Sequence, residues 1–309
     1  MNVAAKLCMV FLGVMASSGL CFGETIYVDQ SGGGDYTTIA DGINAAYPDD
    51  TIKVAPGTYN VTVNINRNIK LVGSGPKYTV INASLNGIEV ASGITTEIRG
   101  FTIMAGGIGI VLNYGSISTI ENNIISGCGS HGIYYYTNNS ASSYAITTTI
   151  RNNTVVFNSD SGISLHQYGA NYSSCNIMGN IVAYNGEDGI YLYLKTENLS
   201  CNNVYANTTN YDNCTVGAGD VSLNPYFMDQ AAGNYALQST SPSIDKGIPG
   251  EPYNDPDGTR NDMGAYSGPN AAAFWPYVPR GPVVTEVDLT PASVPRGGTL
   301  TIRANGRVQ

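Results

Sequence analysis

The side chains best suited to chemistry gather around three similar segments, HGIYYY, SGISLH and DGIYLY. The turn before each segment carries, in chain order, Ser130-His131, Asp160-Ser161 and Glu187-Asp188. If the segments form strands on successive coils of one sheet, the carboxylates of Asp160 and Glu187 stack about 4.8 Å apart. Carboxylates that close either share a cation or hold a proton, which predicts a calcium site or a general acid.

The calcium interpretation and the acid–base interpretation use neighbouring residues. The predicted ligands of Ca²⁺ are Asp160, Glu187 and Asp188. The candidate catalytic residues, which would transfer protons, are Lys195, His131 and His166. Acidic residues in turns are more often simply solvated, and this ordinary role is the favoured alternative.

The same three segments predict an exposed aromatic surface. Alternation along a strand directs Ile133, Ile163 and Ile190 inward, so their neighbours point outward. The outward set comprises Ser164, His166 and four candidate substrate-binding tyrosines, Tyr134, Tyr136, Tyr191 and Tyr193. Sugar rings pack on aromatic rings, and tyrosine hydroxyls bond to their substituents. Tyrosines also suit sheet surfaces in general, and the sequence leaves both interpretations open.

Two columns of similar residues indicate the repeating backbone that would position these side chains. One column has intervals of 22, 23, 30 and 27 residues and comprises Ile88, Ile110, Ile133, Ile163 and Ile190. The other has intervals of 22, 30, 27 and 23 residues and comprises Phe101, Asn123, Asn153, Asn180 and Asn203. Repeats of this length without helical periodicity predict the three-stranded coils of a parallel β-helix. Stacked asparagine amides would bond along its axis in a structural role.

Two kinds of irregular segment interrupt or precede the repeats. The extra residues of the longest repeats fall at 137–144 (TNNSASSY) and 167–174 (QYGANYSS), where they would wall a groove beside the tyrosines. Residues 35–47 (DYTTIADGINAAY) predict a helix, with Asp35 at its start, that caps the open end of the solenoid.

Composition favours strands and turns and argues against several classes of function. Only 12% of the 309 residues are charged, and 37 are glycine, whereas an ordinary domain has about 25% charged residues. The net charge is −9 and no basic run occurs, so a nucleic-acid partner is not expected. We expect a monomer without a membrane span.

The two ends of the chain are predicted to differ from the repeats. Residues 1–23 are typical of a signal peptide, with Lys6 before an apolar stretch, so the protein is expected to be secreted, extracellular or at the cell surface. Residues 268–282 read as a linker, and residues 283–309 resemble the opening strands of an immunoglobulin-like β-sandwich. Export permits disulfides, but their pairing is open among Cys128, Cys175, Cys201 and Cys214.

Two stretches carry a family resemblance. A resemblance to pectinesterases and other pectin-lyase-like right-handed β-helix proteins lies in YVDQSGGGDYTTIADGINAAYPDDTIKVAPGTYNVTVNINRNIKLVGSGPKYTVINA. The closing segment of secreted bacterial right-handed β-helix repeat proteins is similar to LNPYFMDQAAGNYALQSTSPSIDKGIPG and the following NDPDGTRNDMGAYSG. The resemblance covers about residues 24–267. It implies an all-β fold, a right-handed parallel β-helix solenoid with an N-terminal capping helix.

The catalytic motifs of these families are mostly unmatched. The chain lacks the DFIFG segment of pectinesterases, and its nearest matches to polygalacturonase motifs are Asn153-Thr154-Val155 and Gly129-Ser130-His131-Gly132. Calcium-dependent pectate lyases take their acidic ligands and basic residue from separate coils, so the resemblance does not exclude them.

Two hypotheses of function follow. The favoured one is a secreted module that interacts with polysaccharide or cell-surface glycan, for binding or adhesion. The alternative is a calcium-dependent polysaccharide lyase that cleaves an acidic glycan by β-elimination. In it, calcium at the three acidic residues would neutralise the uronate, and Lys195 or a histidine would take the proton from C5.

Overall fold

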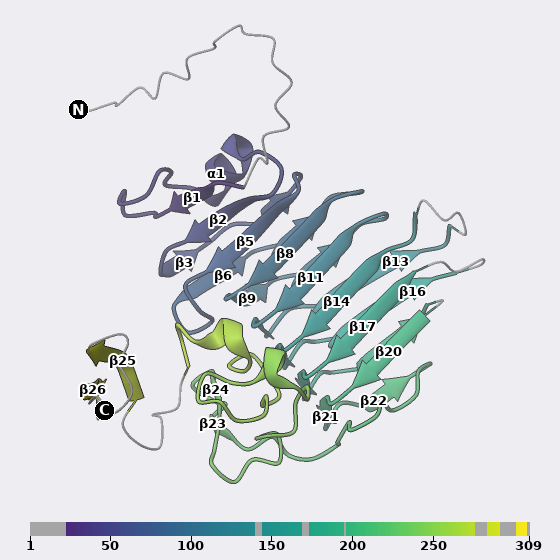
Figure 1. Ribbon diagram of the computed structural model, residues 1–309. Helices are drawn as coiled ribbons and strands as arrows, with labels where there is room; N and C mark the ends of the chain where they lie inside the picture. The colour runs from purple at the N-terminus through teal and green to yellow at the C-terminus, as the bar shows by residue number, and fades with distance from the viewer. Residues whose placement is uncertain are drawn as a thin grey trace, which may run out of the picture.

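The computed structural model describes residues 23–139, 144–168, 173–194, 196–275, 283–290 and 301–307. Within these residues the chain winds through about seven coils, and each coil adds one strand to each of three parallel sheets (Figure 1). We call them sheets A, B and C in the order in which a coil visits them. The parallel β-helix expected from the repeats and from the pectin-lyase-like resemblance is confirmed.

From the second strand of the β-helix onward, consecutive strands fall into different sheets, so each sheet takes every third strand; the first strand joins the second in sheet A. Sheet A contains, in spatial order, β1 (Thr25–Val28), β2 (Asp50–Val54), β5 (Ile69–Gly73), β8 (Thr95–Arg99), β11 (Ile117–Glu121), β14 (Thr147–Arg151), β17 (Ser174–Met178) and β20 (Thr196–Ser200). Sheet B contains β3 (Gly57–Tyr59), β6 (Thr79–Ala83), β9 (Thr102–Ala105), β12 (Ile124–Ser126), β15 (Thr154–Val156), β18 (Ile181–Ala183) and β21 (Asn203–Tyr205). Sheet C contains β4 (Val63–Ile65), β7 (Ile88–Val90), β10 (Ile110–Leu112), β13 (Ile133–Thr137), β16 (Ile163–Gln167), β19 (Asp188–Tyr193) and β22 (Thr209–Asp212).

The core is a stack of aliphatic columns, because one side of every strand points toward the axis. In sheet A the register places in one buried column Ile52, Leu71, Ile98, Ile120, Ile150, Ile177 and Leu199. In sheet C the register confirms the predicted column of Ile88, Ile110, Ile133, Ile163 and Ile190. Burying each such side chain contributes about 2 kcal/mol, so the columns are the main force that holds the coils together.

The predicted asparagine column bonds along the axis, with one correction at its end. Asn123, Asn153 and Asn180 are buried, and each donates its backbone N–H and its side-chain amide to the Oδ1 of the next member. The last member is Asn202, 3.0 Å from the Nδ2 of Asn180, so the prediction of Asn203 was wrong. The true interval is 22 residues. Asn202 and Asn203 are adjacent, so the sequence alone did not show which of them belongs to the column.

A second asparagine ladder runs through the turn between sheets B and C. Its members are Asn158, Asn185 and Asn207, each bonded to the next, and Asn207 donates in turn to Oδ1 of Asn210 in β22. The intervals of 27 and 22 residues repeat those of the first ladder. The spacing of these asparagines in the sequence is therefore a signal for this ladder, although the ladder was not predicted. The ladder fixes the turns from which the strands of sheet C begin.

The helix expected near the N-terminal end is present but starts later. Helix α1 spans Ile39–Ala45, and the Oγ1 of Thr38 accepts the backbone N–H of Asp41 at 3.1 Å. Asp35 was wrongly assigned as the cap, because its carboxylate accepts the N–H of Tyr27 instead. Helix α1 lies at the end of the stack and contacts β1 and β2 (Figure 1). Its role as a cap stays a prediction.

Residues 225–275, which we call the closing segment, cover the outer side of sheet B. The segment contains β23 (Phe227–Asp229), β24 (Asn234–Leu237) and the short 3₁₀ helices η2 (Glu251–Tyr253) and η3 (Pro269–Ala271). One buried cluster joins its side chains to sheet B and comprises Phe227, Tyr235, Leu237, Met263 and Ala265 with Ile124, Val156, Ile181 and Ala183. Sheet B is therefore buried on both sides at β12, β15 and β18.

The ends of the chain are only partly described. Residues 1–22 of the predicted signal peptide and residues 276–282 of the predicted linker lie outside the described residues. Strands β25 (Val283–Thr290) and β26 (Thr301–Arg307) pair antiparallel, and the β-sandwich that they were expected to open stays a prediction, as do the domain boundaries. Among the helices of the described residues, none has the length and apolar character to cross a membrane.

The four cysteines of the described residues carry unpaired thiols. Cys128, Cys175 and Cys201 are buried, and Cys214 is half-buried. Burial raises the pKa values of Cys128, Cys175 and Cys214 to about 12. These three thiols are therefore protonated at neutral pH and behave as small apolar side chains.

Candidate functional site

The three chemistry-bearing segments are neighbouring strands of sheet C, namely β13, β16 and β19. One outward column contains Tyr136, His166 and Tyr193. The other contains Tyr134, Ser164 and Tyr191 and continues to Asp212 on β22. Both columns are the ones expected from the sequence repeat, because a period-two strand and a regular coil leave no other register.

Five tyrosines form a surface that we call the tyrosine face: Tyr134, Tyr136, Tyr168, Tyr191 and Tyr193. Tyr136, Tyr168 and Tyr193 are 49%, 47% and 39% exposed, and the other two are half-buried. The ring centroid of Tyr168 lies 5.4 Å from that of Tyr193 and 6.3 Å from that of Tyr136. The rings of Tyr136, Tyr168 and Tyr193 are therefore contiguous.

Tyr168 belongs to this surface although the sequence analysis did not single it out. It follows the last residue of β16, and its backbone N–H donates to the carbonyl of Thr137 at 3.1 Å. The alternation that directs His166 outward, continued for two more residues, directs Tyr168 outward as well. This alternation is the sequence signal from which Tyr168 could have been predicted. Residues 140–143 and 169–172, parts of the two loops predicted to wall a groove here, lie outside the described residues.

His166 lies beneath the tyrosine rings. Its ring centroid is 4.1 Å from that of Tyr168 and 5.2 Å from those of Tyr136 and Tyr193. The residue is only 8% exposed, and its Nε2 has no hydrogen-bond partner among the described residues. Burial lowers the pKa of His166, so the neutral imidazole is favoured. The structure thus places within an aromatic cluster a polar atom that has no hydrogen-bond partner among the described residues.

His131 lies in the turn before β13 and is held on three sides. Its ring stacks on Tyr134, with centroids 4.6 Å apart and planes 1° apart. Its Nδ1 accepts the backbone N–H of Ser161 at 3.2 Å, and its Nε2 lies 4.0 Å from Oδ2 of Asp160. Burial lowers the pKa of His131, although the neighbouring acids oppose this. The neutral ring therefore carries its proton on Nε2, facing the carboxylate.

The predicted acidic residues occupy adjacent coils as expected. The backbone N–H of Glu187 donates to the carbonyl of Asp160 at 3.3 Å, which fixes their turns one coil apart. Oδ2 of Asp160 accepts the Ser130 hydroxyl at 2.6 Å. Burial raises the pKa of Asp188, and the carboxylates of Asp212 and Glu187 raise it further. The side of the tyrosine face nearest the turns is therefore acidic.

The structure leaves the predicted metal and catalytic roles untested. No three His, Cys, Asp or Glu side chains within the described ranges form a group that could hold a metal ion. Lys195, the predicted base, lies outside the described residues. Calcium binding by Asp160, Glu187 and Asp188 and proton transfer by His131, His166 or Lys195 stay predictions.

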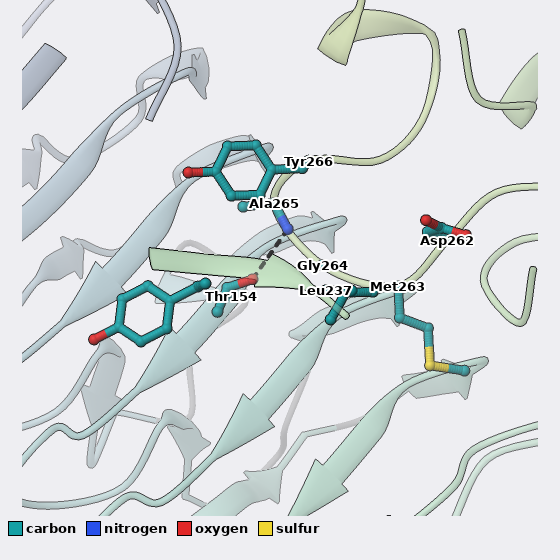
Figure 2. A pocket seen from close by; sticks show the side chains of 8 residues that line it. Thr154, Leu237, Asp262, Met263, Gly264, Ala265 and Tyr266 are labelled. Carbon is teal, nitrogen blue, oxygen red and sulfur yellow. Dashed lines mark hydrogen bonds between the residues drawn. The ribbon is translucent and has the colours of Figure 1, made fainter. Parts of the chain in front are cut away.

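A small recess elsewhere is a packing seam between the closing segment and sheet B. Figure 2 shows its lining, with the backbone N–H of Ala265 donating to Oγ1 of Thr154 at 3.1 Å. Asp262, at its edge, accepts the N–H of Asp245, and Asp255 accepts the N–H of Asp262, each at 2.7 Å. Burial raises the pKa of both Asp255 and Asp262 to about 7. These carboxylates hold the closing segment together.

Fold and surface together define a class of protein: a pectin-lyase-like parallel β-helix that covers one sheet with its own chain and presents an aromatic, acidic surface on another. A family model described as "Periplasmic copper-binding protein (NosD)" matches residues 18–252. The chain belongs to this family.

Individual relatives are more distant or partial. Pectinesterase 1 from Solanum lycopersicum is 41% identical over 107 residues, 32% of this chain and 19% of the relative. The chain thus spans about a fifth of the length of that curated protein. Among solved structures, pectate lyase Pel9A is 13% identical with a TM-score of 0.43, covering 80% of this chain and 97% of its own. Pectin methylesterase from carrot is 14% identical with a TM-score of 0.33, covering 68% and 91%.

Proposed function

We propose that this is an exported protein that binds polysaccharide or cell-surface glycan through the tyrosine face, as a binding or adhesive module. The observation that carries the proposal is the contiguous exposure of Tyr136, Tyr168 and Tyr193 at 49%, 47% and 39%. Large exposed aromatic patches mark interaction sites, and tyrosine suits sugars because it combines an apolar ring with a hydroxyl. The predicted signal peptide and the family's description as periplasmic support export.

Preorganisation of the rings supports binding further. Tyr136 contacts the His166 ring edge-on and Tyr193 contacts it at a tilt, each with its ring centroid 5.2 Å from that of His166. Both rings are therefore held by a buried neighbour. A surface that is already ordered loses little conformational entropy when a ligand docks. The strands add one position about every 4.8 Å along the axis, so the face suits an extended chain better than a single small molecule.

Glycan binding can be tested with a panel of neutral glycans and polyuronates, measured by isothermal titration calorimetry. The double substitution Tyr136→Ala with Tyr193→Ala should weaken binding about tenfold or more, because it removes two stacking rings. Tyr47→Ala is the matched control, since Tyr47 is 74% exposed and lies outside the tyrosine face. Equal affinity of all three proteins, or no binding to any glycan, would contradict the proposal.

The alternative function, a calcium-dependent lyase, needs a base that takes a proton from the sugar. The geometry of His131 is poorly suited to this, because its Nδ1 already accepts the N–H of Ser161 and its Nε2 carries the proton. The measurement that separates the two functions is absorbance of unsaturated products from polyuronates, with and without calcium. Growth of absorbance that is lost in Lys195→Ala would establish the lyase.

The family's description names copper. Copper prefers cysteine, methionine and histidine ligands, and cysteine binds as the thiolate. Burial keeps Cys128, Cys175 and Cys214 protonated, and the described residues contain no group of three His, Cys, Asp or Glu suited to a metal. Among the described residues, no group of His, Cys, Asp and Glu fits a copper centre, and we assign copper no role in the proposed binding.

A further inference from the structure

The tyrosine face has carboxylates on two of its sides. Asp212 follows Tyr191 in the same outward column, one coil further along. Asp188 begins β19, three residues before Tyr191, and receives the Ser161 hydroxyl at 3.5 Å. Both carboxylates interact electrostatically with the Tyr191 ring, whose pKa is raised first by burial and then by its neighbours, these two among them. The sugar-binding rings and the acids therefore form one surface.

These carboxylates have no cationic partner within the described residues. The arginine ion pairs of that part of the chain join Arg99 to Glu97 and Arg151 to Glu121, all on sheet A. The histidine nearest the acids, His131, favours its neutral form. The carboxylates of Asp212 and Glu187 repel that of Asp188, and among the described residues hydroxyl hydrogen bonds from Ser161 and Thr209 offset this repulsion only in part. A bound cation would relieve this repulsion.

His166 is a second and independent sign of a ligand. Its Nε2 has no hydrogen-bond partner among the described residues although the side chain is more than nine-tenths buried. Leaving a buried polar atom unpaired is unfavourable, and such atoms in native structures commonly mark a missing partner. Because four tyrosine rings surround His166, a hydroxyl of a sugar packed on them is a suitable partner.

Resting on the proposed function, we propose that the ligand is a cationic glycan, one whose sugars carry free, protonated amines. Sugar rings pack on Tyr136 and Tyr193, and an ammonium group lies near the Tyr191 ring between the carboxylates of Asp188 and Asp212. An ammonium ion gains from both neighbours, through charge pairing with carboxylates and cation–π attraction to tyrosine. It needs one or two carboxylates, whereas calcium needs six to eight oxygen ligands in a closed set, about 2.4 Å from the ion.

A matched series of ligands tests this inference. Cellohexaose, the hexamer of N-acetylglucosamine and the hexamer of glucosamine share one linkage and differ at the second ring carbon, so only the last is cationic at about pH 6. Calorimetry should show about tenfold tighter binding of the glucosamine hexamer than of the two neutral hexamers, with the difference shrinking at high salt. A galacturonate hexamer, with and without calcium, is the anionic comparison.

Substitutions test whether Asp188 and Asp212 cause the preference for the cationic hexamer. Asp188→Asn with Asp212→Asn should reduce the affinity for the glucosamine hexamer to that for cellohexaose, and leave cellohexaose binding unchanged. Glu251→Gln, at an exposed acid in η2 of the closing segment, should change neither affinity. Circular dichroism melting establishes that each variant is folded.

The outcomes distinguish the two proposals. Equal affinity for all three hexamers, lost in the tyrosine double variant, would overturn the cationic ligand and keep glycan binding. Stronger binding of the galacturonate hexamer with calcium would also overturn the cationic ligand, in favour of a metal-bridged acidic glycan. No binding of any hexamer would overturn both.

Discussion

The outward sides of sheets B and C differ sharply although the same coils build both. On β12 every residue is buried, whereas β13, the next strand of that coil, leaves Tyr136 49% exposed. Sheet B presents aliphatic side chains such as Ile181, which the closing segment covers, and sheet C presents tyrosines. The inward columns are alike in both sheets. A β-helix therefore separates the residues that hold it together from those that it offers to a partner.

The physical reason for the difference lies in the outward side chains themselves. An isoleucine has no group that bonds to water, so a row of them is stable only when another part of the chain excludes water. A tyrosine buries the flat of its ring against a neighbour and keeps its hydroxyl in solvent. The apolar row on sheet B thus requires a cover, whereas the tyrosine face is stable without one.

A charge buried behind sheet B should give the largest difference in stability between the two sheets. Ile181→Asp places a carboxylate in the cluster between sheet B and the closing segment, where Ile181 is 1% exposed. We expect a loss of about 4 kcal/mol or more in the free energy of unfolding, because an unpaired charge loses its hydration there. Tyr136→Asp, outward on sheet C, should cost about 1 kcal/mol or less. Urea unfolding measures both, and similar losses would contradict the distinction between the sheets.

Removing one tyrosine ring from the covered cluster and one from the tyrosine face should give the next largest difference in stability. Tyr235 in β24 is 7% exposed within the covered cluster, whereas Tyr136 is 49% exposed. Tyr235→Ala should lower the free energy of unfolding by about 3 kcal/mol, since it leaves a cavity. Tyr136→Ala should lower it by about 1 kcal/mol or less, because little buried area is lost. Thermal melting of the two variants compares them, and a larger loss at Tyr136 would be the contrary result.

The buried carboxyl of Asp262, on the covered side, should make the free energy of unfolding depend on pH. The pKa of Asp262 is raised from 3.8 to about 7 by burial. As pH rises from about 4 to 7, the unfolded carboxyl ionises first while the folded one keeps its proton, so the folded state loses stability over that window. We expect a loss on the order of 3 kcal/mol from this group.

The Asp262→Asn variant is the control for this pH effect. Its asparagine cannot ionise, so its free energy of unfolding should fall less between the same two pH values than that of the unaltered protein. The two histidines are common to both proteins and cancel in the difference. Identical pH profiles in urea unfolding would show that Asp262 is not the group concerned.

The smallest effect is expected beneath the tyrosine face. His166→Phe replaces a buried imidazole, whose Nε2 has no hydrogen-bond partner among the described residues, by an apolar ring. The free energy of unfolding should change by about 0.5 kcal/mol or less, or rise slightly, because no hydrogen bond within the described residues is lost. Glycan affinity should nonetheless fall if Nε2 binds a sugar hydroxyl. A large loss of stability would show instead that His166 has a structural role.

Much of the site's layout was predictable because a solenoid converts sequence period into neighbourhood. The recurrence of Ile133, Ile163 and Ile190 was enough to place Tyr136 beside His166 and His166 beside Tyr193. The same logic erred by one residue at Asn203, where two asparagines stand together and only the hydrogen bond to Asn202 decides the register. It also placed the start of α1 at Asp35, whereas Thr38 caps the helix.

The sequence by itself determined the coil, its inward columns and the residues that share its outward columns, because each depends on local alternation and a regular repeat. Only the tertiary structure decided which outward side is covered and which is open. It also showed that His166 is buried by the tyrosines around it and that Tyr168 joins them. Exposure depends on segments distant along the chain, such as Met263 packing on sheet B. No pattern within a single coil contains that information.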